Sequence, residues 1–193
     1  MTIPLILETE RLRLEPVGPE HAEGLWRATE ASVRELRPWL VWADGATMEA
    51  TRIFAERSPA MWREGREHAF AVVEEGEVVG AVAVHVPYPQ RGMGELGYWV
   101  RTDRAGRGVC TEAAQAALEF GFVAIGLYRI ELRAGVENRP SQRVAEKLGF
   151  QREGLARRGC ARADGGYDCY LYGLLRTDPR PGPGGATSGD RPA

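Results

Sequence analysis

The sequence predicts an α+β fold, in which a central sheet is flanked by helices. Segments with helical patterns cluster between residues 19 and 57, whereas strand-like segments dominate the middle of the chain. The length of 193 residues suits one domain with a substantial core. We expect that domain over residues 1–176. Residues 177–193 are rich in Pro and Gly, and we expect a disordered tail there because it cannot bury enough apolar surface.

Composition and charge narrow the functional classes. The chain is 44% hydrophobic and 27% charged, and its formal net charge of −2 gives no electrostatic reason to bind nucleic acid or an anionic membrane. Cys110, Cys160 and Cys169 are widely spaced, which argues against a disulfide framework or a zinc knot. Neither a signal peptide nor an apolar run of about 18 residues is found. We expect a cytoplasmic protein without a metal site.

The first elements are predicted from hydrophobic periodicity and capping residues. Arg11–Leu14 alternates polar and apolar residues, the period of a half-buried strand. A helix is expected over Pro19–Ala31, and a second over Met48–Arg57 with Thr47 as its N-cap. The loop between them, Leu36–Trp42, is unusually rich in large aromatic residues.

The middle of the chain is predicted to form a hairpin, a further strand, a glycine turn and a long helix. His68–Glu74 and Glu77–Val86 are rich in β-branched residues and are separated by Glu75-Gly76, as in a hairpin. A strand over residues 94–100 follows. The helix is expected from Gly108 to Ile125, because apolar residues recur there at spacings of three and four and give one buried face.

The C-terminal third is predicted to contain a strand, a capped helix and two shorter strands. Tyr128–Arg133 is the first strand. Asn138 can cap a helix that has Pro140 in its first turn and Gly149 as its left-handed terminal residue. The remaining elements are a short strand near Phe150–Arg152, a turn at Asp164–Gly166 and a strand over Asp168–Leu174.

The segment from Arg104 to Glu112 is the most informative for function. A strand, a glycine turn and a helix start present free backbone N–H groups and a positive helix end, which bind phosphate. Gly106 and Gly108 have no Cβ atoms, so phosphates can approach the backbone closely. The helix dipole favours an exposed anion by about 0.3–1 kcal/mol. The alternative is an ordinary strand–helix turn that binds no ligand.

Four sequence blocks together indicate a family. Their order and spacing are a more specific signal than any one block alone. They are Trp39-Leu40-Val41-Trp42, Glu95-Leu96-Gly97-Tyr98-Trp99-Val100, Gly106-Arg107-Gly108-Val109-Cys110-Thr111-Glu112-Ala113, and Tyr128-Arg129-Ile130-Glu131-Leu132 through Asn138 and Ser141 to Glu146-Lys147-Leu148-Gly149-Phe150. With them the chain resembles the GNAT family of N-acetyltransferases over residues 5–176. The branch is the RimJ/RimL-like one, whose founding members acetylate the N-termini of ribosomal proteins.

The resemblance implies a fold and a cosubstrate. It implies a twisted, mixed but mostly antiparallel sheet of about six to seven strands, in which the parallel strands 94–100 and 128–133 splay apart to form a cleft for acetyl-CoA. The pyrophosphate would lie on the turn at residues 105–110. The residues expected to contact acetyl-CoA are Val100, Arg101, Ala105, Gly106, Arg107, Gly108, Val109, Cys110, Thr111, Asn138 and Ser141.

The turn departs from the family pattern [Q/R]-x-x-G-x-[G/A]. Ala105 and Cys110 occupy its first and last positions. Arg104 or Arg107 could supply the missing cation from one residue away. A thiol at a helix N-terminus can have a lowered pKa, but a small, nearly buried residue is the better interpretation of Cys110 than a nucleophile.

Ser141 is the predicted general acid. It shares one face of its helix with Val144 and Leu148, so it points inward at the end of the strand where the thioester would lie. Its hydroxyl could protonate the departing CoA thiolate. Asn138 could hold the pantetheine amides or the acetyl carbonyl as well as capping the helix. The alternative for Ser141 is that it only satisfies the first turn of the helix.

The acceptor amine must lose a proton before it attacks. At pH 7 this costs about 4.6 kcal/mol for a lysine amine but only about 1 kcal/mol for an α-amine. Glu95 is the predicted base, acting through water, unless it is simply a solvent-facing charge. Glu112 is discounted because its place in the first helical turn is explained by the dipole. His85 is expected near the acceptor side, although a lone histidine is more often structural. Trp39 and Trp42 are also expected there, although they could instead anchor the early helices.

The predicted function is direct acetyl transfer from acetyl-CoA to an amine, by resemblance the N-terminal α-amine of a protein or peptide. Two alternatives remain at this stage: an acetyltransferase for a small-molecule amine, and a module that binds acyl-CoA without turnover. The resemblance also implies a homodimer, because dimers are common in this branch. No nucleic acid or membrane partner is expected.

Overall fold

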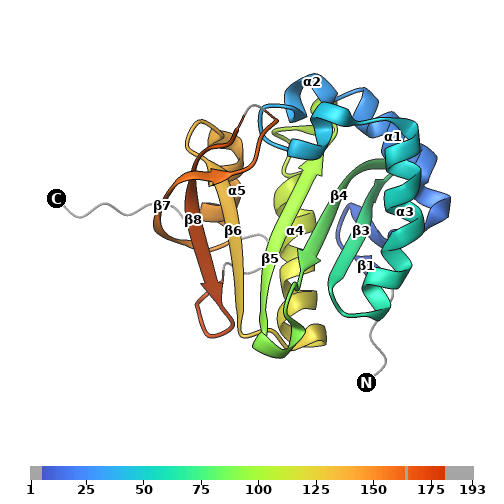
Figure 1. Ribbon diagram of the computed structural model, residues 1–193. Helices are drawn as coiled ribbons and strands as arrows, with labels where there is room; N and C mark the ends of the chain where they lie inside the picture. The colour runs from blue at the N-terminus through green and yellow to red at the C-terminus, as the bar shows by residue number, and fades with distance from the viewer. Residues whose placement is uncertain (1–5, 164, 181–193) are drawn as a thin grey trace.

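The computed structural model describes residues 6–163 and 165–180, and its centre is one eight-stranded sheet (Figure 1). The strands are β1 (Leu7–Glu8), β2 (Leu12–Pro16), β3 (Glu67–Glu74), β4 (Glu77–His85), β5 (Met93–Val100), β6 (Arg129–Gly135), β7 (Gln151–Cys160) and β8 (Tyr167–Leu175). Their order is β1-β2-β3-β4-β5-β6-β8-β7. Every neighbouring pair is antiparallel except β5 and β6, which are parallel.

Helices cover both faces of the sheet. They are α1 (Ala22–Glu30), α2 (Val33–Leu36), α3 (Met48–Arg63), α4 (Val109–Glu119) and α5 (Arg139–Lys147). In Figure 1, α1 and α3 lie over the near face at β3 and β4, whereas α4 and α5 lie behind the sheet. This arrangement confirms the predicted α+β class. Among the described residues, no helix is long and apolar enough to cross a membrane.

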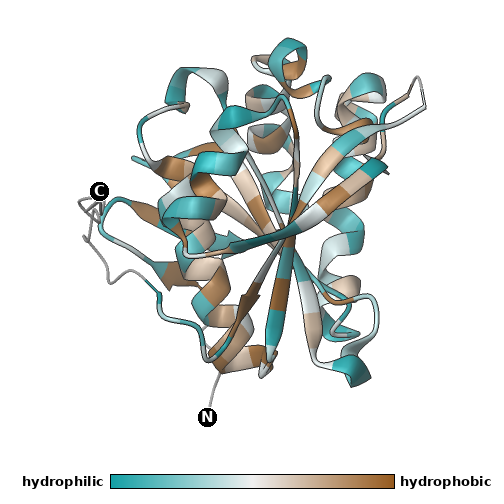
Figure 2. Cartoon of the chain, turned by 90° about the vertical axis from the view of Figure 1, so that its left-hand side faces the viewer, coloured by the Kyte–Doolittle hydropathy of each residue, from teal (hydrophilic) through white to brown (hydrophobic). Residues whose placement is uncertain are grey.

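Two cores lie on opposite faces of the sheet. On β3, Phe70 and Val72 belong to the larger core under α4, while Ala69 and Ala71 belong to the smaller core under α1 and α3. The alternation follows from the two-residue period of a strand. Burial of each large apolar side chain contributes about 1.5–3 kcal/mol. Figure 2 shows brown, hydrophobic bands along the crossing strands and more teal, hydrophilic colour on the outer helix surfaces.

Local signals placed several elements correctly. Glu75 and Gly76 have φ of 52° and 81°, the left-handed values that a two-residue hairpin turn needs. The Thr47 side chain accepts a hydrogen bond from the Ala50 N–H at 3.1 Å, which confirms the predicted N-cap. Gly149 ends α5 with a φ of 85°, and the N–H of Phe150 donates to the carbonyl of Ala145 at 3.0 Å.

Other boundaries were wrong. The sheet has eight strands rather than six to seven, because the two-residue strand β1 was not predicted. Strand β7 is ten residues long and not a short strand at 150–152. The helix expected over 19–31 begins as a 3-10 turn, Pro19–His21, before α1. The helix expected to end at Arg57 continues through Pro59 to Arg63. The helix from Val109 widens into a π-helical segment, Phe120–Ile125.

The chain end is described as far as Arg180. The Arg176 guanidinium donates to the carbonyl of Leu127 at 2.6 Å. The guanidinium of Arg180 lies 3.2 Å from a carboxylate oxygen of Glu119 and 4.9 Å from the ring centre of Phe122. Residues 181–193, most of the predicted tail, lie outside the described residues, as does Asp164 of the predicted turn.

His68 of β3 makes stability depend on pH. It is buried against the rings of Trp62 and Phe120, its Nδ1 has no hydrogen-bond partner among the described residues, and burial lowers its pKa. The unfolded chain, with a pKa of 6.5, therefore binds this proton more tightly than the folded chain. The stability that neutral His68 contributes should be fully present above pH 6.5 and decrease as the pH falls below that value. Urea titrations at several pH values should show this decrease.

The control for this effect is His68→Phe, which keeps an aromatic ring at the position. The variant should lose the decrease that begins near pH 6.5 and keep any loss that begins at lower pH from carboxylates. An equal decrease in both proteins would show that His68 is not its source.

Candidate active site

The parallel strands β5 and β6 separate in the middle of the sheet. They pair at only three positions, of which Glu95–Glu131 is the last. Beyond that point β5 stays paired with β4 through Val100, and β6 stays paired with β8 through Gly135 (Figure 1). Backbone N–H and C=O groups on the two facing edges are therefore not paired with each other, and they can bond a ligand that enters between the strands.

The glycine turn leads directly into α4. Gly106 and Gly108 have φ of 75° and 85°, a conformation that favours glycine. In the described part of the chain, the N–H groups from Gly106 to Thr111 have no hydrogen-bond acceptor. They lie at the positive end of an 11-residue helix. Ala105 precedes them and donates its own N–H to the carbonyl of Thr102 at 3.1 Å. The turn thus has the donors that a phosphate requires.

Residues just before β2 hold the turn in place. The carboxylate of Glu112 accepts from the Thr9 hydroxyl at 2.6 Å and from the Arg11 guanidinium at 2.6 Å. Arg11 also donates to the carbonyl of Arg107 at 3.1 Å. Glu112 is therefore engaged in positioning α4, which agrees with its being discounted as a base. Arg11 was missed because it is distant in sequence and its partner is set by tertiary packing.

The three arginines of the turn have different surroundings. Arg101 is bonded to Asp103 at 2.6 Å and to Glu77, and Arg104 is bonded to Glu74 at 2.9 Å. The side chain of Arg107 is exposed and has no partner among the described residues. Arg107 is thus the guanidinium available to an anion. The expectation for Arg101 is weakened, because its charge is already paired on the side of the β3–β4 hairpin.

The residues that follow the turn are mostly enclosed. Burial raises the pKa of the Cys110 thiol to about 12, so the thiolate is scarce at neutral pH. This supports a small, half-buried residue rather than a nucleophile. Val109 is 1% exposed and packs in the larger core, and Val100 packs against that core. Thr111 lies in the first turn of α4 with its N–H free.

Ser141 meets Tyr98 where the strands have separated. Its Oγ lies 3.1 Å from the phenolic oxygen of Tyr98, on β5. Burial raises the pKa of Tyr98, so the phenol stays protonated at neutral pH and can donate. The side chain of Asn138 accepts from the Ser141 N–H at 3.2 Å, which confirms the predicted cap. Tyr98 was missed as a site residue, although it stands in the strand block that carries the resemblance.

The loop after β6 is held by a buried amide that the sequence did not single out. Gln142 is 5% exposed and donates from Nε2 to the carbonyls of Gly135 and Val136 at 2.8 and 3.0 Å. It fixes the end of β6 relative to α5, and with it the position of Ser141.

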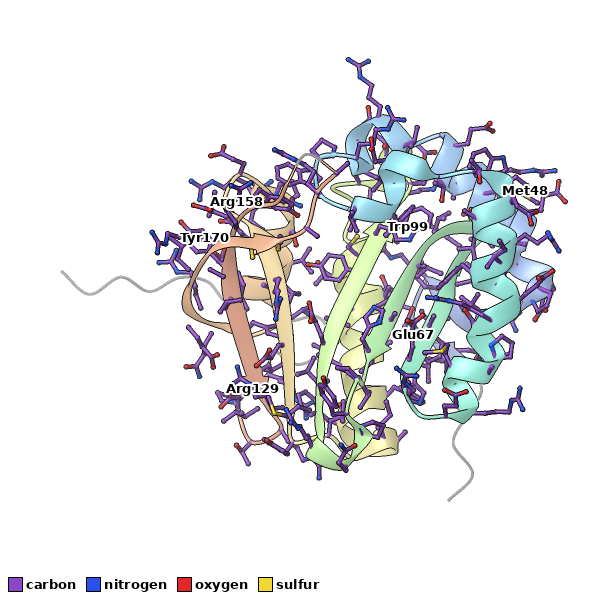
Figure 3. All side chains as sticks on the ribbon, viewed as in Figure 1. Met48, Glu67, Trp99, Arg129, Arg158 and Tyr170 are labelled. Atoms are coloured by element: carbon purple, nitrogen blue, oxygen red, sulfur yellow. The ribbon has the colours of Figure 1, made fainter. Side chains whose placement is uncertain are left out.

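The opposite face of the sheet carries Glu95 and His85. The Glu95 carboxylate is 42% exposed and lies 3.8 Å from the guanidinium of Arg133. The Nδ1 atom of His85 lies 3.0 Å from the carboxylate of Glu67, which is only 9% exposed. Figure 3 labels Glu67 low on this face and Trp99 at the upper end of β5.

Trp39 and Trp42 lie over the same face, near the ends of the separated strands. Trp39 packs edge-on against Tyr167, with ring centres 6.0 Å apart, and its carbonyl accepts from the Tyr167 hydroxyl at 2.8 Å. Gly135 lies beneath both rings: a Cβ there would come within 2.8 Å of Tyr167. Trp42 is 43% exposed and packs 5.6 Å from Trp99. These rings form an aromatic wall at the end of the opening.

Metal ligands are not grouped in the described residues: no cluster of three or more His, Cys, Asp or Glu could hold an ion.

Comparisons with known proteins decide the family. The protein-family model described as acetyltransferase (GNAT) domain matches residues 11–151. The chain belongs to the GNAT acetyltransferase family. The GNAT fold implied by the resemblance, with one parallel pair in a mostly antiparallel sheet, is thereby confirmed.

Relatives of this GNAT protein match nearly its whole length. The uncharacterized N-acetyltransferase p20 of Bacillus licheniformis is 29% identical, over 89% of this chain and 97% of the relative. The ribosomal-protein-serine acetyltransferase of Escherichia coli is 26% identical, over 86% of this chain and 94% of the relative. The structure of Mycobacterium smegmatis RimJ in complex with CoA-disulfide is 29% identical in sequence and has a TM-score of 0.78. The match covers 86% of this chain and 82% of that chain. These matches confirm the acyltransferase class and agree with the resemblance to the RimJ/RimL-like branch.

Proposed function

We propose that this GNAT protein transfers an acetyl group from acetyl-CoA directly to a primary amine, the α-amine of a protein or peptide N-terminus. One observation carries the proposal: the separation of β5 and β6 opens beside a helix start whose N–H groups have no acceptor in the described part of the chain. Such an opening suits a long ligand with phosphates at one end and a reactive group between the strands.

The residues present fit acetyl-CoA. The N–H groups of residues 106–111 and the guanidinium of Arg107, which has no partner among the described residues, would hold the pyrophosphate. Glycine at 106 and 108 leaves room for it. The facing strand edges would hold the pantetheine amides. The RimJ structure, a complex with CoA-disulfide, supports this use of the fold. Acetyl-CoA supplies a thioester whose carbonyl an amine can attack.

The side chains around the opening suit both proton transfers of that reaction. The nitrogen forms a C–N bond as the C–S bond breaks, and the departing thiolate needs a proton. Ser141, bonded to the protonated phenol of Tyr98, can donate it. The amine's proton must leave toward the opposite face, where Glu95 and His85 lie.

An α-amine is the acceptor whose deprotonation requires the least free energy at this site. It costs about 1 kcal/mol to deprotonate at pH 7, against about 4.6 kcal/mol for a lysine amine. The name of the E. coli relative, a ribosomal-protein-serine acetyltransferase, supports a protein N-terminus. The wall formed by Trp39, Trp42 and Tyr167 would flank the incoming chain. The same proposal includes a cytoplasmic location, a homodimer, a domain over residues 1–176 and a tail over 177–193.

Release of free thiol tests the function. The purified protein is mixed with acetyl-CoA and one of four compounds. Three are amines: a peptide with a free serine N-terminus, a peptide whose only amine is on lysine, and a small polyamine. The fourth is the blocked control, the N-acetylated form of the serine peptide. We expect thiol release and one added acetyl group with the first peptide and none with the blocked one. Release with the polyamine alone would favour the small-molecule alternative. Binding of CoA without release for any amine would favour the non-catalytic module.

A further inference from the structure

A row of titratable side chains crosses the sheet on the face opposite α4. On neighbouring strands, Glu67 of β3 lies opposite His85 of β4. His85 in turn lies opposite Glu95 of β5, and Glu95 lies opposite Glu131 of β6. Register partners point to the same face, on strands about 4.8 Å apart. The row ends at the last position where β5 and β6 pair. It therefore borders the opening in which the proposed reaction takes place.

Glu67 and His85 form a dyad within this row. The carboxylate of Glu67 is 9% exposed and lies 3.0 Å from Nδ1 of His85, whereas the imidazole is 45% exposed. A buried carboxylate that accepts from Nδ1–H fixes the tautomer in which Nε2 carries the free lone pair. In the described part of the chain, Nε2 has no hydrogen-bond partner.

Gly97 leaves space in front of Nε2. It is the first residue of β5 past the separation that points to this face, and a Cβ built on it would lie 3.5 Å from Nε2. Because glycine has no side chain, an amine or a water at this place can reach Nε2. The imidazole thus faces the opening, with its other nitrogen anchored in the protein.

We propose that His85 is the general base that takes the proton from the acceptor amine, and that Glu67 is the positioning residue that orients its imidazole. This inference rests on the proposed function. The amine's proton passes to Nε2, directly or through one water, while Nδ1–H stays bonded to Glu67. The neutral nitrogen forms the C–N bond and loses its second proton to solvent. The C–S bond breaks, and the thiolate takes its proton from Ser141, which solvent then reprotonates. His85 then returns its proton to solvent.

The charges that face His85 suit this task. Glu67 from β3 and Glu95 from β5 raise the pKa of the imidazole, whereas burial and Arg57 from α3 lower it. The net direction is upward from 6.5, because the bond to Glu67 outweighs burial. A raised pKa makes the imidazole a stronger proton acceptor. The Glu95 carboxylate, by contrast, faces Arg133, so we assign it to the electrostatics of the row rather than to proton removal.

The test compares pH profiles of kcat/KM for acetylation of the serine peptide. His85→Gln keeps an N–H donor for Glu67 but cannot accept a proton, and we expect kcat/KM to fall by about 100-fold or more. The acidic limb of the pH profile should disappear in His85→Gln, while the Kd for CoA stays within about two-fold of the wild-type value. Glu67→Gln should move the acidic limb to lower pH, because it removes the carboxylate that raises the pKa of His85. Glu23→Gln, an exposed carboxylate change on α1, is the matched control and should leave the profile unchanged.

An NMR titration of the His85 imidazole in the unliganded protein gives a second measurement, which does not require His85→Gln to fold. Its pKa should lie above 6.5 and decrease in Glu67→Gln. Two results would overturn this inference alone. The first is thiol release by the wild type together with full activity and an unmoved acidic limb of the pH profile in a folded His85→Gln protein. The second is an unchanged imidazole pKa in Glu67→Gln. Failure of the wild type to release thiol with any amine would overturn the proposed function and this inference with it.

Discussion

Replacing Gly108 by glutamate is expected to abolish CoA binding, with a loss of at least about 100-fold in affinity. The new carboxylate would stand at the N-cap of α4, beside the N–H groups that we assign to the pyrophosphate. A carboxylate placed against a bound phosphate costs several kcal/mol of binding free energy, and each 1.4 kcal/mol is a tenfold change in Kd. Isothermal titration of CoA into the variant measures the effect directly.

The control for Gly108→Glu must share its backbone strain. Gly108 has a φ of 85°, so any side chain there costs about 1–2 kcal/mol of stability. Gly65, after α3, has a φ of 68°, and a Cβ added to it would meet no atom of another segment within 4 Å. Gly65→Glu should therefore lose similar stability and keep CoA affinity. Unchanged affinity in a folded Gly108→Glu protein would remove the turn from the cosubstrate site.

Replacing Ser141 by alanine is the second change with a large expected effect. Turnover should fall by about 100-fold or more, because the departing thiolate loses its proton donor. The Kd for CoA should stay nearly unchanged, since the hydroxyl is one contact among many. Single-turnover measurements at saturating peptide separate the two quantities.

Tyr98→Phe distinguishes the two hydroxyls. It removes the phenol that lies 3.1 Å from Ser141 Oγ but keeps the ring in the core. Its kcat should fall less than that of Ser141→Ala if Tyr98 acts by orienting the serine. A full rate in Ser141→Ala would reduce Ser141 to a residue of the helix's first turn, and Tyr98 would become the candidate donor.

Features that depend on neighbouring residues could be predicted from the sequence. The caps at Thr47 and Asn138, the left-handed Gly149 and the hairpin turn at Glu75-Gly76 each depend on a few consecutive residues, whose conformational preferences are strong. The glycine turn before α4 was predicted for the same reason. Strand β7 was underestimated because its exposed, arginine-rich sequence lacks alternation and its pairing with β8 defines it.

Contacts between distant segments could not be predicted. Arg11 and Glu112 are 101 positions apart, and Tyr98 and Ser141 are 43 apart, so no local pattern marks either pair. The His85–Glu67 pair depends on the register of β3 against β4, which includes a bulge at Val72/Val73. His85 was therefore expected on the acceptor side but without its carboxylate partner. Trp39 shows the same limit, because its neighbour Tyr167 lies on β8.

The central claim is that the opening beside α4 receives the CoA end of the cosubstrate. Titration of CoA into ¹⁵N-labelled protein, followed by the backbone amide shifts, tests it most directly. The account predicts that the largest shifts occur at the N–H groups of residues 106–111, with further shifts along the separated edges of β5 and β6. Saturable binding with the largest shifts elsewhere on the protein, and none at residues 106–111, would contradict it.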